Sequence, residues 1–370
     1  MKLKLFLLMV LFSLFFLTES YSQSRKFVNE FLNIGVGAKN LAMFGARTAS
    51  TDDITAAYWN PSGLLNIKAP FQVSAMHAEW FAGIAQYDYL GFGKKLGKDQ
   101  NSFGSISIIR MGVDNIPNTI NLIGSDGRVN YDEISQFSAA DYAFIASYAG
   151  TFFENMRLGG NTKVIYRQIG KFANAWGFGF DVGTQFKFNN LSVGVMGKDI
   201  TSTFTSWAFN FSDEEKTVFA ATGNEIPKSS VEFGLPKIIA GIAYEGGLGK
   251  DKKGFSYLIE LDLNFSTDGR RHSLVTSNFI DISPALGLEL GLKERVFIRA
   301  GFGNLQRVLN EIDGDAAPFE IQPNIGVGLK LGRLNIDYAL ANAGEVASVL
   351  YSHIFSVSLN LAGKNRDTEL

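Results

Sequence analysis

The sequence predicts an all-β protein in which about 14 antiparallel strands close into a transmembrane β-barrel, preceded by a short N-terminal plug segment. Three observations lead to this fold class. Long segments alternate between apolar and polar side chains, the connections between them are alternately short and long, and the chain opens with an export signal. Transmembrane barrels combine these features because each strand faces lipid on one side and the lumen on the other.

The start of the chain has the features of a secretory signal peptide. Lys2 and Lys4 precede an apolar run from Leu5 to Leu17, which at about 13 residues is too short to span a membrane as a helix. Small residues at positions 20 and 22 offer a cleavage site, so residues 1–22 are expected to be removed on export. The alternative is an uncleaved anchor. With 0 Cys, the chain has neither a lipid-attachment thiol nor a disulfide framework.

Composition excludes several other classes of protein. The net charge of −2 and the pI of about 6.0 give no basic field for nucleic acid. After the signal peptide, no apolar run approaches the length of a membrane-spanning helix. Aromatic residues make up 13% of the chain and 39 residues are Gly, whereas only 8 are Pro. This balance favours long strands that pack against apolar surroundings.

The clearest strands alternate over a length suited to a membrane. In residues 176–188, Phe178 and Phe180 alternate with Gly179 and Asp181, and residues 255–265 repeat the pattern. Strands of soluble sandwiches usually have about five or six residues, whereas transmembrane strands need roughly 9–11. The expected strands begin near Phe71, Ala85, Ser102, Asp141, Met156, Trp176, Leu191, Pro236, Phe255, Pro284, Arg295, Gln322, Leu334 and Ser352.

The lengths of the connections support the same fold. Connections after even-numbered strands are short, whereas residues 112–140, 199–235, 266–283 and 304–321 form long connections after odd-numbered strands. Outer-membrane barrels have short periplasmic turns and longer outer loops. A soluble sandwich, the alternative fold, gives no reason for this segregation. Residues 70–361 are therefore predicted to form the barrel, and residues 362–370 a polar tail.

Residues 23–69, between the expected cleavage site and the first strand, are too many for an ordinary connection. A Thr or Asp at positions 51–53 can cap a short helix over residues 54–59, and the sequence Asn-Pro-Ser-Gly at 60–63 stops that helix. A short helix with Tyr58 and Trp59 and little charge needs burial. The segment is predicted to fold into the lumen as a plug. A periplasmic cap and a rim segment are the alternatives.

The stretch at residues 35–64, GVGAKNLAMFGARTASTDDITAAYWNPSGL, resembles the N-terminal signature of the PorV/PorQ family, which is itself similar to the FadL-type outer-membrane transporters. Residues 332–361 resemble the last hairpin of that family, whereas the middle of the chain matches only in the rhythm of its strands. The residues that carry the signature are Gly37, Ala38, Gly45, Ala46, Asp52, Asp53, Ala57, Asn60, Pro61 and Gly63, with Trp59 among them.

The resemblance implies a FadL-like barrel of about 14 strands in the outer membrane of a Gram-negative bacterium of the Bacteroidota type. Family members with a known role serve the type IX secretion system, as partners of its translocon or of its cell-surface attachment complex. Two departures leave the branch of the family open. Phe44 stands where Gly is common in the signature, and a polar tail follows the last strand.

The sequence offers no catalytic centre. Its 3 His residues are His77, His272 and His353, and His77 lies on the same side of a strand as Glu79, as half of a metal or hydrolase site would. No Cys and no GxSxG nucleophile motif accompany them. Neither an enzyme, nor a bound metal, nor a cofactor is expected. The acidic connection at 311–320 could bind calcium weakly, although solvated acidic loops are more common.

Two groups of residues are candidates for function. The lumen face is expected to carry charges of both signs, which fit paired groups around a plug better than the single-sign ring of a selective pore. These lumen residues are Arg167, Asp181, Lys187, Glu260, Asp262, Arg299 and Asp337, with Arg157, Lys163 and Glu289 beside them. The connection at 199–235 is rich in aromatics, which mark either a docking surface for a partner or a gate over the barrel mouth. These aromatics are Phe204, Trp207, Phe209, Phe211, Phe219 and Phe233.

The expected function is that of a non-enzymatic outer-membrane barrel that serves as an accessory partner of a protein secretion machine, the type IX system that the resemblance implies. Its expected partners are outer-membrane lipid and other secretion-system proteins, with no nucleic acid. The alternative is a FadL-like transporter of small hydrophobic compounds, and a hydrolase is a third possibility. Transport needs a continuous apolar pocket that reaches a gap in the wall, whereas docking needs exposed apolar surface outside the lumen.

Overall fold

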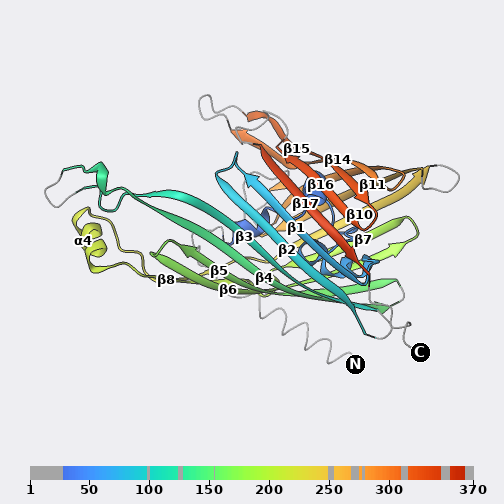
Figure 1. The fold of residues 1–370 in the computed structure, drawn as a ribbon, viewed down its shortest axis with the longest axis horizontal. Coiled ribbons are helices and arrows are strands. Elements are labelled where there is room, and N and C mark those ends of the chain that lie inside the picture. The colour runs from blue at the N-terminus through green and yellow to red at the C-terminus, as the bar shows by residue number, and fades with distance from the viewer. Residues whose placement is uncertain are drawn as a thin grey trace.

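Fourteen antiparallel strands close into a barrel in the computed structural model (Figure 1). The structure describes residues 28–97, 101–123, 128–153, 155–248, 254–267, 275–276, 280–309, 316–342 and 351–362. The strands of the wall are β1 (Phe71–Trp80), β2 (Ala85–Leu96), β3 (Ser102–Asn118), β4 (Ser135–Phe153), β5 (Met156–Ile169), β6 (Ala173–Phe188), β7 (Leu191–Lys198), β10 (Lys237–Leu248), β11 (Phe255–Ser266), β13 (Asp281–Leu292), β14 (Val296–Leu309), β15 (Ala316–Leu331), β16 (Leu334–Ala341) and β17 (Ser352–Leu361). Three further strands, β8 (Phe204–Phe209), β9 (Ser230–Phe233) and β12 (Val275–Thr276), pair with β6, β8 and β13 respectively.

The first and last strands seal the ring. β1 pairs with β17 from Phe71 opposite Leu361 to Glu79 opposite His353, and with β2 along its other edge. Every wall strand therefore has two antiparallel neighbours, as a sheet in lipid requires because unpaired backbone groups are costly there. The predicted fold class is confirmed, and each expected strand start falls within or beside a wall strand. The expected signal peptide and nearly all of the polar tail lie outside the described residues.

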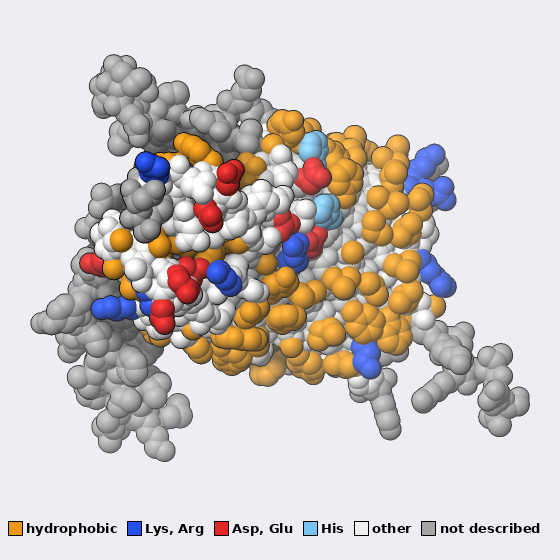
Figure 2. Space-filling view, turned by 60° about the vertical axis from the view of Figure 1, so that its left-hand side comes forward, with side chains coloured by type: hydrophobic (Ala, Val, Ile, Leu, Met, Phe, Trp, Pro, Cys, Tyr) orange, Lys and Arg blue, Asp and Glu red, His pale blue; other side chains and the backbone are white. Residues whose placement is uncertain are grey.

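Apolar side chains cover a broad band of the outward face. On β6, outward-facing Phe178, Phe180 and Val182 alternate with Gly179 and Asp181, which are buried toward the lumen. Figure 2 shows this band between basic side chains at one end of the barrel and charges of both signs at the other. Such a band is what a transmembrane barrel presents to lipid. Within the described part of the chain, no helix is long and apolar enough to cross a membrane.

The two ends of the barrel differ. The end that carries the turns β2–β3, β4–β5, β6–β7, β10–β11, β13–β14 and β15–β16 is called the short-turn end, and the opposite end the long-loop end. At the long-loop end, β3 to β6 and β8 extend beyond their neighbours, and α4 (Asp213–Ala221) lies at the tip of this extension (Figure 1). The connection at 199–235 is thus largely built of β8, α4 and β9. The capping box between Ser212 and Glu215 fixes the start of the helix.

Residues 28–70, called the inner segment, run inside the ring of strands (blue in Figure 1). Their elements are η1 (Glu30–Asn33), α2 (Ala38–Ala42), α3 (Ala56–Trp59) and η2 (Pro61–Asn66). Ile54, Tyr58 and Trp59 pack with wall residues such as Ile109 and Ile165 in a core of buried apolar side chains. The helix predicted over 54–59 is shorter in the structure. The Asp53 carboxylate accepts the backbone N–H of Thr55 at 2.9 Å, and this local turn replaces the first part of the helix.

Candidate functional site

Two carboxylates of β11 hold the inner segment against the wall. Asp262 accepts hydrogen bonds from the backbone N–H groups of Arg47 and Thr48, at 3.1 and 3.0 Å. Two residues earlier on the same face, Glu260 accepts the backbone N–H of Ala49 at 2.6 Å. Both carboxylates are buried. These hydrogen bonds give buried backbone N–H groups the acceptors that they need away from water, so the pair fixes this turn of the inner segment to β11.

Glycine residues on the inner face of the wall make room for the inner segment. A Cβ atom on Gly301 of β14 would collide with the backbone of Met43 and Phe44, and one on Gly159 of β5 with the backbone of Pro61. The inner segment also crowds Gly183, Gly194, Gly241, Gly287, Gly303 and Gly326. The segment therefore approaches seven strands of the wall closely, which glycine permits because it has no side chain.

The aromatic pair Tyr58–Trp59 lies at the centre of the inner segment. The indole N–H of Trp59 donates to the carbonyl oxygen of Val36 at 2.8 Å. Its ring packs against Gly35 and Gly45, whose φ angles are 97° and 75° and where a Cβ atom would collide with the indole. The chain around these glycines therefore wraps the indole closely, and a side chain at either position would force the ring or the backbone to shift.

Asn60 and Pro61 turn the chain from α3 into η2. The Asn60 side-chain amide donates to the carbonyl oxygens of Thr48 at 2.8 Å and Thr184 at 3.1 Å, and its oxygen accepts the N–H of Ser62 at 3.2 Å. Pro61 occupies the first position of η2, where no backbone N–H is needed. The other signature residues Gly37, Asp52, Asp53 and Gly63 also lie in the inner segment. The motif thus satisfies backbone groups and sets a turn.

Two cations share the carboxylate of Asp52. Lys39 Nζ and Arg47 Nη2 lie 2.6 and 2.8 Å from its Oδ1 atom. Only 1% of the Arg47 side chain is exposed, whereas half of Asp52 remains exposed. Burial raises the pKa of the Asp52 carboxyl, but Lys39 and Arg47 lower this pKa by more, so that it lies well below its usual range. The carboxylate is therefore charged at neutral pH and compensates a buried guanidinium.

A polar cavity of about 710 Å³ opens between this ion pair and the wall near the short-turn end. Its lining includes Lys39, Asp52, Lys68, Lys187, Glu245 and Glu289. Arg157 of β5, also in the lining, donates to the side-chain oxygen of Asn66. The Asn66 amide donates in turn to Thr51 at 2.7 Å and to Gln185 at 3.0 Å. This cavity suits charged or hydrogen-bonding groups better than apolar ones.

The charged residues predicted for the lumen are paired between strands of the wall. Arg299 of β14 lies 2.6 Å from Glu289 and 2.7 Å from Asp337. Lys163 of β5 lies 2.7 Å from Asp181 of β6. These groups are buried or nearly so. Opposite charges offset part of the cost of taking each charge out of water.

Two further predicted lumen charges lie nearer the ends of the barrel. Arg167 pairs with Asp141 at 2.8 Å, and its guanidinium carbon lies 5.0 Å from the ring centre of Trp207 at the long-loop end. Lys187 pairs with Glu245, and both are about half exposed beside the polar cavity. The lumen charges are thus not arranged as a ring of one sign.

At the long-loop end, aromatic side chains of the 199–235 connection stack on the lumen side of the wall. The ring centres of Trp207, Phe209 and Phe211 follow one another at 6.3 and 6.2 Å. Phe211 contacts Phe219 of α4 at 5.1 Å and Phe172 at 6.1 Å. Trp207 is only 8% exposed. These five residues form what is called the aromatic row.

Phe204 faces the opposite way from the aromatic row. It is 43% exposed on the outward face of β8, directly opposite Phe233 of β9, which is 57% exposed. The connection therefore has two faces. Its lumen side carries the rings that the gating prediction needs, and its outer side carries the exposed rings that the docking prediction needs. Both roles stay predictions.

Sequence reasoning missed several residues of the lumen. Lys39, Arg47 and Asn66 of the inner segment were not singled out, nor were the glycines that receive this segment. A signal for the glycines was present, because Gly177, Gly179 and Gly183 lie on one face of β6. Gly183 receives Asn60 of the inner segment, whereas Gly177 and Gly179 receive Thr205 and Thr203 of the long connection. Repeated glycine on one face of a strand marks the close approach of another chain segment.

The remaining predicted residues form no metal site in the described part of the chain. His77 and Glu79 face outward from β1. His272 and the side chains of the acidic connection at 311–320 lie outside the described residues. Among the described residues, no group of three or more His, Cys, Asp or Glu side chains is placed to hold a metal ion.

This geometry defines a FadL-like barrel, and solved structures share it. The chain is similar to the P. putida toluene transporter TodX, with a TM-score of 0.54 and 11% identity over 89% of this chain and 99% of that one. The Ralstonia pickettii toluene transporter TbuX gives 0.53 and 13%, over 88% and 98%. A Pseudomonas aeruginosa FadL homologue gives 0.50 and 9%, over 88% and 98%. No protein-family model and no curated protein matches the sequence. At such low identity the similarity shows the fold.

The predicted accessory role in a type IX secretion machine is wrong. The structural neighbours are hydrocarbon transporters and a FadL homologue, and they support neither that role nor an assignment to the PorV/PorQ family. They favour the alternative function given in the sequence analysis, that of a FadL-like transporter of small hydrophobic compounds.

Proposed function

We propose that the protein is an outer-membrane channel through which small hydrophobic compounds cross. The solved structures with the same fold include two toluene transporters and a monoaromatic hydrocarbon channel. The observation that carries the proposal is the aromatic row on the lumen side of the long-loop end. Stacked rings offer a small apolar compound a place to leave water, because its transfer to apolar surroundings is favourable.

The two ends of the lumen differ in polarity, and this difference determines at which end a hydrophobic compound enters. Below the aromatic row, partly buried Leu32 and Ile34 of the inner segment and Trp80 and Met111 of the wall pack against the same apolar core. The short-turn end instead holds the polar cavity. An apolar compound is therefore taken up at the long-loop end. Long loops outside the cell and short turns inside are the usual orientation of such barrels.

The inner segment acts as the plug predicted for residues 23–69. It fills the lumen between the aromatic row and the polar cavity, and it touches the wall at the glycines described above. A compound that passes straight through needs this segment to shift. The bonds from Asp262 and Glu260 to the turn at residues 47–49 are among those that resist such a shift.

The location that belongs to this function is the outer membrane of a Gram-negative bacterium, reached through the export signal at residues 1–22. Membrane lipid is then the immediate neighbour of the wall. The resemblance to the PorV/PorQ signature is compatible with a FadL-like barrel, and the branch of the family stays a prediction.

Uptake of a labelled monoaromatic hydrocarbon by cells that express the protein tests this function. Trp207→Ala removes a buried ring of the aromatic row that lies on β8. Phe204→Ala is the matched control, because it removes a ring from the same strand on the outward face. We expect the wild type and Phe204→Ala to raise the initial rate of uptake several-fold over cells without the protein, and Trp207→Ala to lose most of that increase.

The proposal fails if the folded wild-type barrel gives no faster uptake than cells without it. It also fails if Trp207→Ala and Phe204→Ala lower uptake equally. Resistance of the barrel to unfolding in detergent at room temperature shows in each case that the variant is assembled.

A further inference from the structure

Ionisable side chains gather on the outward face of the wall, where lipid is expected. They come from β1, β2, β3 and β17, and the alternation of burial along these strands places them outward. Figure 2 shows histidine side chains beside acidic and basic ones at an interruption of the apolar band. This group, called the outer polar patch, consists of His77, Glu79, Asp88, Arg110 and His353.

The outer polar patch is only partly satisfied by its own members. Asp88 lies 2.7 Å from the Nδ1 atom of His77 and accepts a hydrogen bond from Arg110 at 3.1 Å. Glu79 lies directly opposite His353 in the β1–β17 pairing, but it has no hydrogen bond or ion pair within the described part of the chain. The side chains of His77 and Asp88 remain 53% and 38% exposed. Polar atoms therefore reach whatever surrounds the wall.

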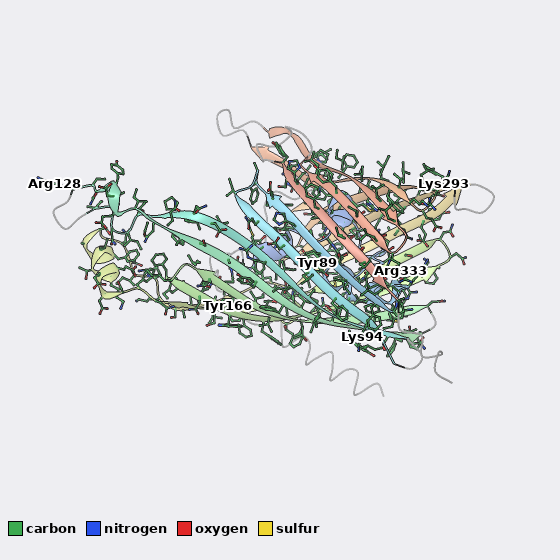
Figure 3. All side chains as sticks on the ribbon, in the orientation of Figure 1. Tyr89, Lys94, Arg128, Tyr166, Lys293 and Arg333 are labelled. Carbon is green, nitrogen blue, oxygen red and sulfur yellow. The ribbon has the colours of Figure 1, made fainter. Side chains whose placement is uncertain are left out.

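The patch lies at a height that other strands keep apolar. On β2, Phe92 and Leu90 are the only outward side chains between Lys94, near the short-turn end, and Asp88. On β11, all outward positions from Phe255 to Phe265 are apolar. A strand needs about 9–11 residues to cross the hydrocarbon layer, and only about six residues separate Lys94 from Asp88. Figure 3 shows Lys94 near one end of β2 with Tyr89 well along the strand.

A charged or polar side chain that faces lipid at this height lowers the stability of the barrel, and such side chains are found mainly where they have a function. Charged side chains on the lipid face destabilise a barrel, and ionisable residues inside the membrane mark functional sites. The patch carries two carboxylates beside one guanidinium and two imidazoles. A lipid phosphate at Arg110 would meet the carboxylate of Asp88, which disfavours it. A protein surface that itself carries both signs is the better match.

We propose that the outer polar patch is the contact surface of a homodimer, in which two copies of this chain meet about a twofold axis along the membrane normal. A twofold contact needs a surface that complements itself, since each pair of residues occurs twice. With the axis beside β2, Glu79 of β1 faces the partner's Arg110, and Arg110 faces the partner's Glu79. The unpartnered carboxylate thereby gains a cation, and the patch leaves the lipid.

The mass of the full-length protein in mild detergent tests the dimer. We expect twice the mass of one chain for the wild type, and the mass of one chain for the double variant Glu79→Gln/Arg110→Gln. Removal of two lipid-facing charges leaves the fold of the wall intact, which the same resistance to unfolding in detergent checks.

Cross-linking in native membranes gives a second measurement, because the chain contains 0 Cys. Leu90→Cys places a thiol on the outward face of β2 beside the expected axis, and Ile259→Cys places one at a similarly exposed site on β11. Mild oxidation should link two copies through Leu90→Cys and not through Ile259→Cys. A wild type with the mass of one chain, or equal cross-linking at both sites, would overturn the dimer. The dimer would also be overturned if the wild type has the mass of one chain plus bound lipid and the double variant has lost that lipid. The patch would then be a lipid site.

Discussion

Asp262 of β11 accepts the backbone N–H of Arg47 across a separation of 215 residues in the sequence. The same turn of the inner segment is anchored a second time through the Arg47 guanidinium, which lies 2.8 Å from Asp52. The first partner, Asp262, belongs to the wall, and the second, Asp52, belongs to the inner segment itself. The turn at residues 47–49 is therefore one of the points where the barrel sets the position of the inner segment.

Asp262→Ala should loosen the inner segment without opening the wall. The substitution leaves the N–H groups of Arg47 and Thr48 without their acceptor in a buried site, at a cost of about 1–3 kcal/mol for each unpaired group. Amide hydrogen exchange at residues 47–50 should speed up, while the strands keep their protection. Asp262→Asn retains an oxygen acceptor and should have a smaller effect. Unchanged exchange in Asp262→Ala would show that this turn is held by other contacts.

Trp59→Ala should convert a closed lumen into a conducting one. The indole fills the space between two glycines and bonds Val36, and loss of a large buried aromatic costs about 3–5 kcal/mol. Single-channel recordings in planar bilayers should show no steady conductance for the wild type and open events for the variant. Phe180→Ala, on the outward face of β6, is the control and should stay closed. Conductance in the wild type itself would contradict a plugged lumen.

A cation should be tolerated on one face of β11 and not on the other. Ile259 faces outward and is 45% exposed, whereas Ser256 lines the polar cavity. Ile259→Arg should destabilise the barrel by about 2–4 kcal/mol if it lies near the middle of the bilayer. Ser256→Arg should cost much less. Urea unfolding in lipid vesicles measures both values, and equal values would argue against a membrane on the outward face.

Gly301→Ala should disturb the seat of the inner segment. Its Cβ atom would collide with the backbone of Met43 and Phe44, and overpacking of this kind costs about 1–3 kcal/mol. Gly160→Ala is the matched control on β5, because its Cβ atom would make an ordinary contact of 3.5 Å with the carbonyl oxygen of Asp181. The free energy of unfolding should fall in Gly301→Ala and change little in Gly160→Ala. Equal free energies in the two variants would mean that the inner segment can move away from the wall.

The wall could be predicted from the sequence because each transmembrane strand carries its own alternation. Residues 176–188 show which side chains face lipid whatever their neighbours are. The short elements of the long-loop end could not be found in this way, since β8 and α4 cross no membrane and have no required length. The helix predicted over 54–59 was too long because the side chain of Asp53 competes with the helix for backbone groups.

The sequence predicted which charged residues face the lumen, but not which of them contact one another. Arg299 was expected on the inner face, but its partners Glu289 and Asp337 lie on β13 and β16, and only the register of the four strands β13 to β16 brings them together. The partners of Glu260 and Asp262 are backbone groups of the inner segment. A pattern of side chains in the sequence cannot predict such backbone partners. The functional prediction followed a short signature at the chain ends, whereas the similarity to solved structures spans most of the wall.

The long reach of the bonds to the inner segment has a consequence for the order of assembly. Ala38 donates to Ser356 of β17 across 318 residues, and Asn161 of β5 donates to Ala57 across 104. The inner segment precedes every strand in the chain, yet its partners are complete only when the last strand is in place. Closing the ring and burying its contents are thus a single late step, built on distant contacts that form slowly. A chain that ends before β17 would carry exposed apolar side chains, a mark by which the cell's chaperones and proteases can tell an unfinished copy from a finished one.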